Sequence, residues 1–329
     1  MATLGFDDRE LQKLMSDDEE LARAEETPEA PVNPVSIEGD VWVLGNHRII
    51  CGDSTKAEVV EKLLEGQQAD IAFTSPPYNA NVKFGSLHKG NMGPLYANSE
   101  DNRSSDAYVQ FAKDVLSLTL ASVRKHVFWN VNYNTKSRFE YIAQIVDFLP
   151  LLIEQVCWKK DAVIPYQQGL RRFWEPIYIF KASSKVGNVG DDKVCQDNFI
   201  EIRCVGAQKV ANHRACFPVG LPKWALELDT KPGDSVFEPF SGSGTTIIAA
   251  EMTGRHCYAI ELNPAYVDVA VKRWEQFSGS KATLDGDGRT FEQIDEARYA
   301  KTGAPDNSAA SYDAAIAEMR KEHEVASAV

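Results

Sequence analysis

Short apolar runs that end at polar turns recur along the chain, and stretches with helical spacing separate them. Such runs are typical of buried strands. In the first half they occupy residues 48–53, 70–74, 126–131 and 176–181. Residues 57–64, between the first two, place apolar side chains along one helix face. Strands that alternate with helices predict an α/β fold and not a β-sandwich.

The alternation continues in the second half around a glycine-rich turn. Residues 234–240 predict a strand, 241–246 a tight turn and 247–253 a helix. The next strand, residues 256–260, ends at Glu261. This strand–turn–helix–strand unit presents polar groups at the carboxyl ends of its strands, where open α/β sheets bind ligands.

The distribution of polar residues divides the chain into three regions. Residues 1–36 predict an acidic helix and a proline-containing linker that is too polar for a core. Residues 37–284 hold the predicted strands, and residues 285–329 predict an acidic tail. Within the middle region, 79–107 predict a polar loop and 183–212 a loop-rich insert without periodicity. Because the two ends carry none of the candidate chemistry, we expect activity to survive their removal.

The net charge of −13 is confined to these two ends. Residues 1–38 contribute −8 and residues 285–329 contribute −5, so residues 39–284 are balanced. Within the balanced part, residues 79–214 carry an excess of Lys and Arg. The acidic composition therefore does not exclude a polyanionic partner such as DNA.

Composition and motif counts exclude several other classes of protein. The longest uncharged run has 12 residues, which is too short for a membrane-spanning helix. The first residues lack the basic and apolar regions of a secretory signal. The six cysteines form no Cys-x-x-Cys pair, so neither a metal site nor a disulfide framework is indicated. We expect a cytoplasmic protein with reduced thiols.

The glycine turn indicates a nucleoside-containing cofactor. Gly242 and Gly244 allow a ligand to approach the backbone at a helix start, where free N–H groups point outward. Glu261, at the tip of the next strand, is placed to accept hydrogen bonds from ribose hydroxyls. The third glycine of a dinucleotide fingerprint is replaced by Ile247, and the Gly-Lys-Ser/Thr ending of a P-loop is absent.

A second candidate motif is the turn Ser75-Pro76-Pro77-Tyr78, which follows an apolar strand. Two prolines fix φ at successive positions and remove two N–H donors. The remaining rigid turn offers oxygens beside an aromatic ring. It therefore suits a planar group that bears an amine, because the oxygens accept its N–H bonds while the ring stacks on it. A proline turn with a purely structural role is the alternative.

Together the two motifs resemble those of the amino-group DNA methyltransferases, which transfer a methyl group from S-adenosylmethionine to an exocyclic base nitrogen. Residues 75–78 resemble the catalytic motif and residues 240–244 the cofactor loop. Residues 213–218 resemble the motif that precedes that loop, and 157–160 and 171–178 resemble the segments between. The catalytic motif comes first, which is the order of the permuted beta subgroup. The resemblance implies a Rossmann-like class I methyltransferase fold with circularly permuted motif order, a mixed, mostly parallel sheet, helices on both faces and a loop-rich recognition insert.

The resemblance also implies roles for individual residues. Catalysis is assigned to Ser75, Pro76, Pro77 and Tyr78. Cofactor binding is assigned to Asp53, Phe217, Pro218, Glu238, Phe240, Ser241, Gly242, Ser243, Gly244, Thr245, Thr246 and Glu261. DNA contacts are expected from Lys83, Lys89, Arg171, Arg172, Lys185, Lys193, Arg203 and Lys209. The implied cofactor is S-adenosyl-L-methionine and the implied partner is double-stranded DNA, with no membrane or metal. Further candidate partners are a second copy of the chain and a cognate restriction enzyme or phage host system.

The implied reaction is a direct displacement by the base amine on the sulfonium methyl. Ser75 Oγ and the Pro76 carbonyl would accept the amine protons, and Tyr78 would stack on a base flipped out of the duplex. Serine at the first motif position favours N4 of cytosine. N6 of adenine stays the alternative, since a hydroxyl accepts a proton from either amine.

Other activities fit the two motifs less well. A C5-cytosine methylase needs a catalytic thiol in a Pro-Cys pair, which the chain lacks. An NAD-dependent oxidoreductase would explain Gly242, Gly244 and Glu261, but it leaves the proline turn unexplained. A catalytically silent DNA-binding protein is a third class, and the intact matches at both motifs argue against it.

Overall fold

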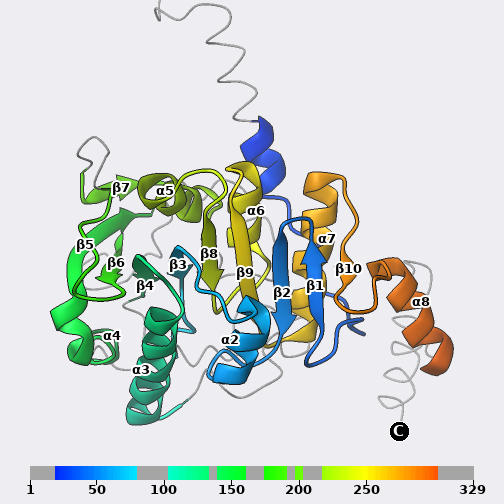
Figure 1. The fold of residues 1–329 in the computed structure, drawn as a ribbon, viewed down its shortest axis with the longest axis horizontal. Helices are drawn as coiled ribbons and strands as arrows, with labels where there is room; N and C mark the ends of the chain where they lie inside the picture. The colour runs from blue at the N-terminus through cyan, green and yellow to red at the C-terminus, as the bar shows by residue number, and fades with distance from the viewer. Residues whose placement is uncertain are drawn as a thin grey trace, which may run out of the picture.

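The computed structural model describes residues 19–79, 103–132, 139–160, 174–190, 197–202 and 217–302. These residues form a ten-stranded sheet in the order β10-β1-β2-β9-β8-β3-β4-β6-β5-β7 (Figure 1). The strands are β1 (Val41–Leu44), β2 (His47–Cys51), β3 (Ile71–Thr74), β4 (His126–Asn130), β5 (Leu152–Lys159), β6 (Trp174–Lys181), β7 (Phe199–Glu201), β8 (Ser235–Glu238), β9 (His256–Glu261) and β10 (Thr283–Leu284). The five central strands, from β2 to β4 in the sheet order, are parallel. β6 is antiparallel to both of its neighbours, so the predicted mixed, mostly parallel sheet is confirmed.

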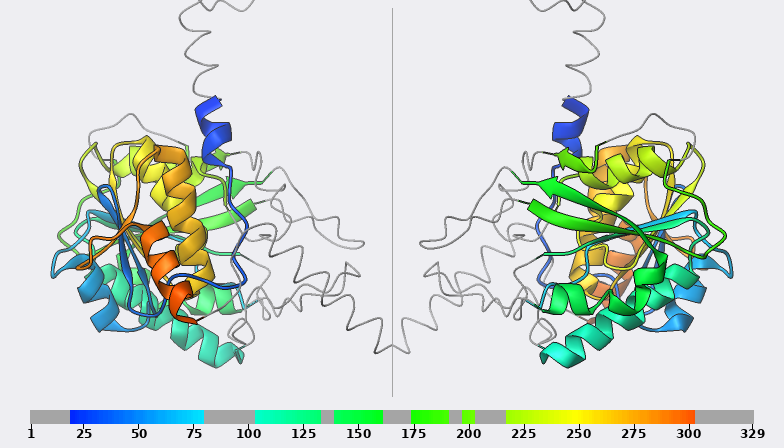
Figure 2. Two further views of the ribbon diagram at one scale, coloured as in Figure 1. Left: turned by 90° about the vertical axis from the view of Figure 1, so that its right-hand side faces the viewer. Right: turned by 90° about the vertical axis from the view of Figure 1, so that its left-hand side faces the viewer.

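Helices cover both faces of this sheet, as predicted (Figure 2). One face packs against α5 (Gly220–Asp229), α6 (Thr245–Met252) and α7 (Pro264–Ser278). The opposite face packs against α2 (Ala57–Leu64) and α3 (Ser105–Ala121). Two short helices, α4 (Glu140–Ala143) and the 3₁₀ helix η2 (Val146–Leu151), precede β5. Neighbouring strand residues such as Ala72 and Phe73 belong to opposite cores, because side chains alternate across a strand.

The two candidate motifs meet at one edge of the sheet although they are far apart in the chain. β3 and β8 are parallel neighbours, with Ala72 opposite Phe237. The proline turn follows β3 and the glycine turn follows β8, so both lie at the carboxyl ends of adjacent strands. This edge is where doubly wound α/β proteins bind their ligands.

Residues 19–36, which belong to the predicted acidic helix and linker, are bound to the domain in the structure. We call residues 19–36 the N-terminal strap. Its first residues are helical, and its last part is bound to α7 by the buried Asp268 carboxylate. That carboxylate accepts the backbone N–H groups of Val35 and Ser36 at 2.6 and 3.0 Å. The polar, proline-containing sequence does not predict this contact, because the contact uses backbone hydrogen bonds and few apolar side chains.

The acidic tail predicted from residue 285 also begins inside the folded domain. Helix α8 (Phe291–Thr302) buries Phe291 and Ile294 in the core. Its Arg298 pairs with Asp40 at 2.6 Å, next to β1. Charged residues surround Phe291 and Ile294 in the sequence, so composition alone does not indicate that this helix packs on the domain. Within the described parts of the chain, none of the helices has the length and apolar character needed to cross a membrane.

Candidate active site

The glycine turn after β8 has a backbone conformation that other residues adopt only at a cost. Gly242 and Gly244 have φ values of +53° and +80°. A Cβ atom on Gly244 would lie 2.9 Å from the Cβ of Ala270 in α7. Glycine therefore allows α6 to begin directly against α7, and it leaves the first N–H groups of α6 without a side-chain cap.

Glu261 ends β9 and its carboxylate holds the glycine turn. Oε2 accepts the Gly242 N–H and Oε1 accepts the Asn263 N–H, both at 2.8 Å. Burial raises the pKa of Glu261, and these N–H donors oppose the rise. A third backbone donor is Leu262, and the carboxylate still has lone-pair capacity for a hydroxyl group.

The polar side chains of the glycine turn differ in their hydrogen bonding within the described part of the protein. Arg273 of α7 donates to the Ser243 carbonyl at 3.2 Å and to Thr245 Oγ1 at 3.1 Å. Thr246 Oγ1 donates to Glu238. By contrast, Ser241 Oγ is buried and has no hydrogen-bond partner within the described segments. A buried hydroxyl in that state costs free energy, so Ser241 is a candidate contact for a bound ligand.

Glu238 connects the two candidate motifs. Its fully buried carboxylate accepts from Thr74 Oγ1 at 2.5 Å, from Thr246 Oγ1 at 2.9 Å and from the Phe240 N–H at 3.0 Å. Burial raises its pKa to about 7, and the nearby Glu261 charge adds to the rise. Glu238 therefore joins the strand of the proline turn to the glycine turn, and its predicted contact with the cofactor stays a prediction.

This pKa gives Glu238 a pH-dependent contribution to the free energy of unfolding. Its pKa is about 7 in the folded chain against an ordinary value of 4.5, so the folded chain binds this proton more tightly. The contribution is fully present below about pH 4.5 and is lost as the pH rises through about 7. Glu238→Gln, neutral at every pH, should remove this loss in urea unfolding measured across that range.

The matched control for this experiment is Glu58→Gln, because Glu58 is an exposed glutamate on α2. It should leave the pH profile of the wild type unchanged. The interpretation fails if the free energies of unfolding of wild type and Glu238→Gln differ by the same amount at all pH values.

The proline turn presents a chain of hydroxyl hydrogen bonds. Ser75 Oγ lies 2.6 Å from the Tyr78 hydroxyl and donates to Asn130 Oδ1 at 3.1 Å. Asn130 is buried at the end of β4, and its Nδ2 donates to the Pro176 carbonyl, which directs Oδ1 toward Ser75. Because the Ser75 hydroxyl donates its proton to the hydrogen bond with Asn130, its oxygen accepts a hydrogen bond from the Tyr78 hydroxyl. The oxygen then keeps one lone pair for another donor.

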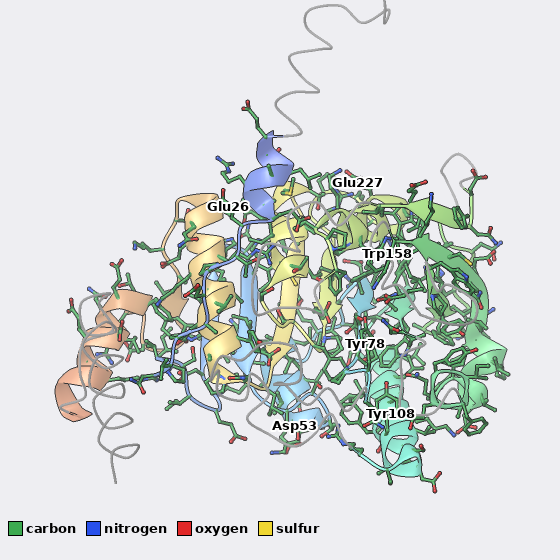
Figure 3. The ribbon with its side chains drawn as sticks, turned by 180° about the vertical axis from the view of Figure 1, so that it is seen from behind. Glu26, Asp53, Tyr78, Tyr108, Trp158 and Glu227 are labelled. Carbon is green, nitrogen blue, oxygen red and sulfur yellow. The ribbon has the colours of Figure 1, made fainter. Side chains whose placement is uncertain are left out.

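Contacts from α3 and from the residues just before it hold the proline turn in place. The Tyr108 hydroxyl donates to the Pro77 carbonyl at 2.7 Å (Figure 3). Asn79 has a φ of +53° and is buried, and its Oδ1 accepts the Arg103 N–H at 2.8 Å. The Asn79 side chain thus connects the start of the predicted polar loop to residue 103 of the same loop. These contacts fix the orientation of the turn relative to β4.

A partly buried cluster around the Glu175 carboxylate lies at the start of β6, next to Asn130 of the proline-turn network. Lys160 and Asn132 both donate to Glu175 Oε1, and Lys160 lies 4.7 Å from the ring centroid of Trp158. Burial raises the pKa of Glu175, and the Lys160 charge opposes the rise. Neither this cluster nor Asn130 was identified from the sequence, although both lie at strand ends, the signal that identified Glu261. The described residues contain no group of His, Cys, Asp or Glu side chains that could hold a metal ion.

The remaining predicted cofactor residues lie around the same edge. The Phe217 ring packs edge-on against Phe73, with 5.3 Å between centroids, and the buried Pro218 follows it. The ring centroids of Phe240 and Phe111 lie 5.8 Å apart. Asp53 follows β2 (Figure 3), and its Oδ1 accepts from the Thr55 N–H and hydroxyl, so it also forms the turn before α2.

Most of the residues expected to contact DNA lie outside the described residues. They are Lys83, Lys89, Arg171, Arg172, Lys193, Arg203 and Lys209. Lys185 is described and exposed, but it follows the end of β6, where Lys181 pairs with His126 at the start of β4. Lys185 is therefore near the sheet edge opposite Ser75, and this position does not support a DNA contact beside the proline turn. The predicted insert returns to the Ser75 edge at Ile202, whose carbonyl accepts from Trp158 Nε1 at 3.0 Å.

Comparison with known proteins identifies the family. A family model for N6/N4 methyltransferases, described as DNA methylase, matches residues 69–272, which include both the proline turn and the glycine turn. The chain belongs to this DNA methylase family. The match covers more than half of the chain, so the resemblance seen in the sequence is confirmed, and the chain is a DNA methyltransferase of the cytosine-N4 or adenine-N6 kind.

Individual DNA methylases are similar to the chain over different lengths. The Type II methyltransferase M.HpaI of Haemophilus parainfluenzae is 22% identical over 275 residues, which are 76% of this chain and 78% of that protein. M.Cfr9I of Citrobacter freundii is 48% identical over 61 residues, so the match spans only 20% of its length and 18% of this chain. Among solved structures, the PvuII DNA methyltransferase (cytosine-N4-specific) has a TM-score of 0.52 and 19% identity, with 82% of this chain and 94% of that chain covered. The predicted class I methyltransferase fold is thus confirmed.

S-adenosylmethionine is the cofactor of this family, and the residues at the glycine turn fit it. Glu261 keeps lone-pair capacity for a ribose hydroxyl, and Ser241 offers a buried hydroxyl that has no hydrogen-bond partner among the described residues. The positive φ values of Gly242 and Gly244 leave the backbone open to close approach. These residues would hold the nucleoside part of the cofactor.

Removal of the Glu261 carboxylate is expected to weaken cofactor binding. Glu261→Ala should raise the dissociation constant for S-adenosylmethionine at least tenfold, about 1.4 kcal/mol, because it removes the ribose acceptor and frees the Gly242 N–H. Calorimetric titration measures the constant, and thermal melting checks that the fold is retained. An unchanged constant in a folded variant would show that Glu261 does not bind the ribose.

Proposed function

We propose that the chain methylates the N4 amine of cytosine in double-stranded DNA and that it has the circularly permuted motif order of the beta subgroup. The observation that carries the choice of base is Ser75. Its neutral hydroxyl, whose proton is directed to Asn130, occupies the first position of the catalytic motif. The earlier position of the proline turn in the chain, beside the strand of the glycine turn, supports the permuted order.

The residues of the proline turn would act on the target amine. The lone pair of an exocyclic amine is delocalised into the base ring, so the enzyme must localise it on nitrogen. Ser75 Oγ and the Pro76 carbonyl would do this by accepting the two amine protons as positive charge develops on nitrogen. When bound, S-adenosylmethionine supplies the electrophilic methyl group on its sulfonium sulfur.

Tyr78 would have two tasks at this site. Its ring would stack on the flipped base, because a base inside a duplex cannot reach the cofactor. Its hydroxyl, 2.6 Å from Ser75 Oγ, would orient the remaining Ser75 lone pair. The Tyr108 and Asn79 contacts would keep this geometry constant before DNA binds, which limits the reorganisation needed during the reaction.

The names of relatives support a DNA-modification system. M.HpaI and M.Cfr9I are named Type II methyltransferases, and the PvuII enzyme is titled cytosine-N4-specific. We therefore also propose a cognate restriction enzyme as a genetic partner. The excess of Lys and Arg between residues 79 and 214 supports contact with the DNA backbone.

Mass spectrometry of nucleosides tests the proposal directly. DNA of mixed sequence is incubated with the protein and methyl-labelled S-adenosylmethionine, digested and analysed. Labelled N4-methyldeoxycytidine is the expected product. Labelled N6-methyldeoxyadenosine would overturn the choice of base, and the absence of both from DNA with a folded, cofactor-binding protein would overturn the activity.

A further inference from the structure

We infer that the N-terminal strap is a positioning element of the cofactor site, which holds the glycine turn and the start of α5 at a fixed spacing. The inference rests on the proposed function for its activity readout and on the family cofactor for its binding readout. It concerns residues 19–36, which precede the first strand and lie outside the matched family region. The strap runs along α7 on the side of the molecule seen in Figure 3.

Arg273 connects the strap to the glycine turn. Its Nη2 donates to the Ala24 carbonyl at 2.7 Å. Its Nη1 donates to the Ser243 carbonyl, Ser243 Oγ and Thr245 Oγ1 at 3.1 to 3.3 Å. The side chain is only 3% exposed, and a guanidinium presents its donors in one rigid plane. The position of Ala24 therefore constrains the position of the glycine turn.

The next residue of the strap contacts the other wall of the site. Glu25 Oε1 accepts the Val219 N–H at 2.8 Å. Val219 is the N-cap residue of α5, and no side-chain cap of its own satisfies the helix start. Glu25 is 194 residues earlier in the chain and supplies an acceptor there. Phe217 and Pro218, which the family resemblance assigns to cofactor binding, directly precede this contact.

Two consecutive strap residues thus bridge the two segments that enclose the cofactor site. The rest of the strap is held independently, because Asp268 binds Val35 and Ser36 at its other end. Arg23 lies 5.1 Å from the ring centroid of Phe277, which adds a contact near Ala24. Loss of the Glu25 acceptor alone should therefore loosen the start of α5 without detaching the strap. This differs from the expectation that the N-terminal region is dispensable.

The test compares four single variants of the full chain. Glu25→Ala removes the acceptor. Glu25→Gln keeps an oxygen that can accept the Val219 N–H. Glu26→Ala is the matched control, because Glu26 is an exposed glutamate on the same segment (Figure 3). Glu25→Asp withdraws the carboxylate by one methylene while keeping its charge, and it serves as a second disruptive variant if Glu25→Ala does not fold.

Glu25→Ala and Glu25→Asp are expected to raise the dissociation constant for S-adenosylmethionine about three- to tenfold. The rate of methyl transfer at saturating cofactor should stay close to that of the wild type, because Ser75 and Tyr78 are untouched. Glu25→Gln should restore tight binding, and Glu26→Ala should match the wild type. Without cofactor, amide hydrogen exchange at Val219 should be faster in the two disruptive variants only.

Different results overturn different statements. If the wild type does not bind S-adenosylmethionine, the cofactor assignment of the site fails. If the wild type binds it and Glu25→Ala binds equally well, the strap has no positioning role. If Glu25→Gln is as weak as Glu25→Ala, or if Val219 exchange is the same in all variants, the contact with α5 is not the cause and the inference is also rejected.

Discussion

Replacing Ser75 by alanine is expected to slow single-turnover methyl transfer about 10²–10³-fold, by analogy with the loss of one oxyanion-hole donor. The change removes the hydroxyl that accepts an amine proton, and it leaves Asn130 and Tyr78 without their shared partner. The dissociation constant for S-adenosylmethionine should stay close to that of the wild type, because Gly242 and Glu261 are unchanged. Rapid-quench measurement on cognate DNA, beside cofactor titration and thermal melting, separates chemistry from binding and stability.

Variants of Tyr78 show which part of the turn acts in this reaction. Tyr78→Phe keeps the ring and removes the hydroxyl that lies 2.6 Å from Ser75. It should therefore retain DNA binding and lose part of the rate. Tyr78→Ala also removes the stacking face, worth roughly 1–3 kcal/mol for a base on an aromatic platform. If Ser75→Ala folds and turns over at the wild-type rate, the proposed chemistry is wrong and the turn is only a structural element.

Gly244→Ala is expected to lower the free energy of unfolding by about 2–5 kcal/mol. The backbone φ of +80° costs a residue with a Cβ roughly 1–2 kcal/mol. The added methyl group would also lie 2.9 Å from the Cβ of Ala270, and such overpacking adds about 1–3 kcal/mol. Because α6 must move away from α7, cofactor affinity should fall as well. Urea unfolding measures the first effect.

Gly279→Ala separates the two causes. Gly279 ends α7 with a φ of +72°, and no atom lies within 4 Å of its hypothetical Cβ. This variant should show only the backbone cost, so it should be less destabilised than Gly244→Ala. Equal losses of stability in the two variants would show that the approach of α6 to α7 is not tight at the glycine turn.

Sequence patterns were sufficient for the residues that carry their own local signal. The glycines of the turn, Glu261 at a strand tip and the Ser75 turn were identified because each follows an apolar run. Asn130 follows such a run too, but its role depends on β4 lying beside β3. Glu175 needs the antiparallel pairing of β6 with β4. Which strands are neighbours depends on pairing between segments that are far apart in the sequence. The periodicity of apolar residues carries no information on that pairing.

The docked ends show a second limit of sequence patterns. Backbone groups of the N-terminal strap form hydrogen bonds with the side chains of Asp268 and Arg273. Every residue carries such backbone groups, so the amino-acid composition does not predict these contacts. Lys185 illustrates another limit, because a lysine in a loop has the same sequence signal at either edge of the sheet. Its position opposite Ser75 follows only from the pairing of Lys181 with His126.

The pairing of β3 with β8 has a consequence for how the chain is made. The Thr74–Glu238 hydrogen bond joins residues 164 positions apart, and the neighbouring β2–β9 pairing is also long-range. During synthesis, β2 and β3 leave the ribosome long before their central partners exist, so their edges stay open to chaperones or to other nascent chains. Such non-local pairing predicts slow folding. S-adenosylmethionine can stabilise only a chain whose synthesis has passed Glu261, so the cofactor cannot stabilise the shorter nascent chain in which β2 and β3 are already exposed.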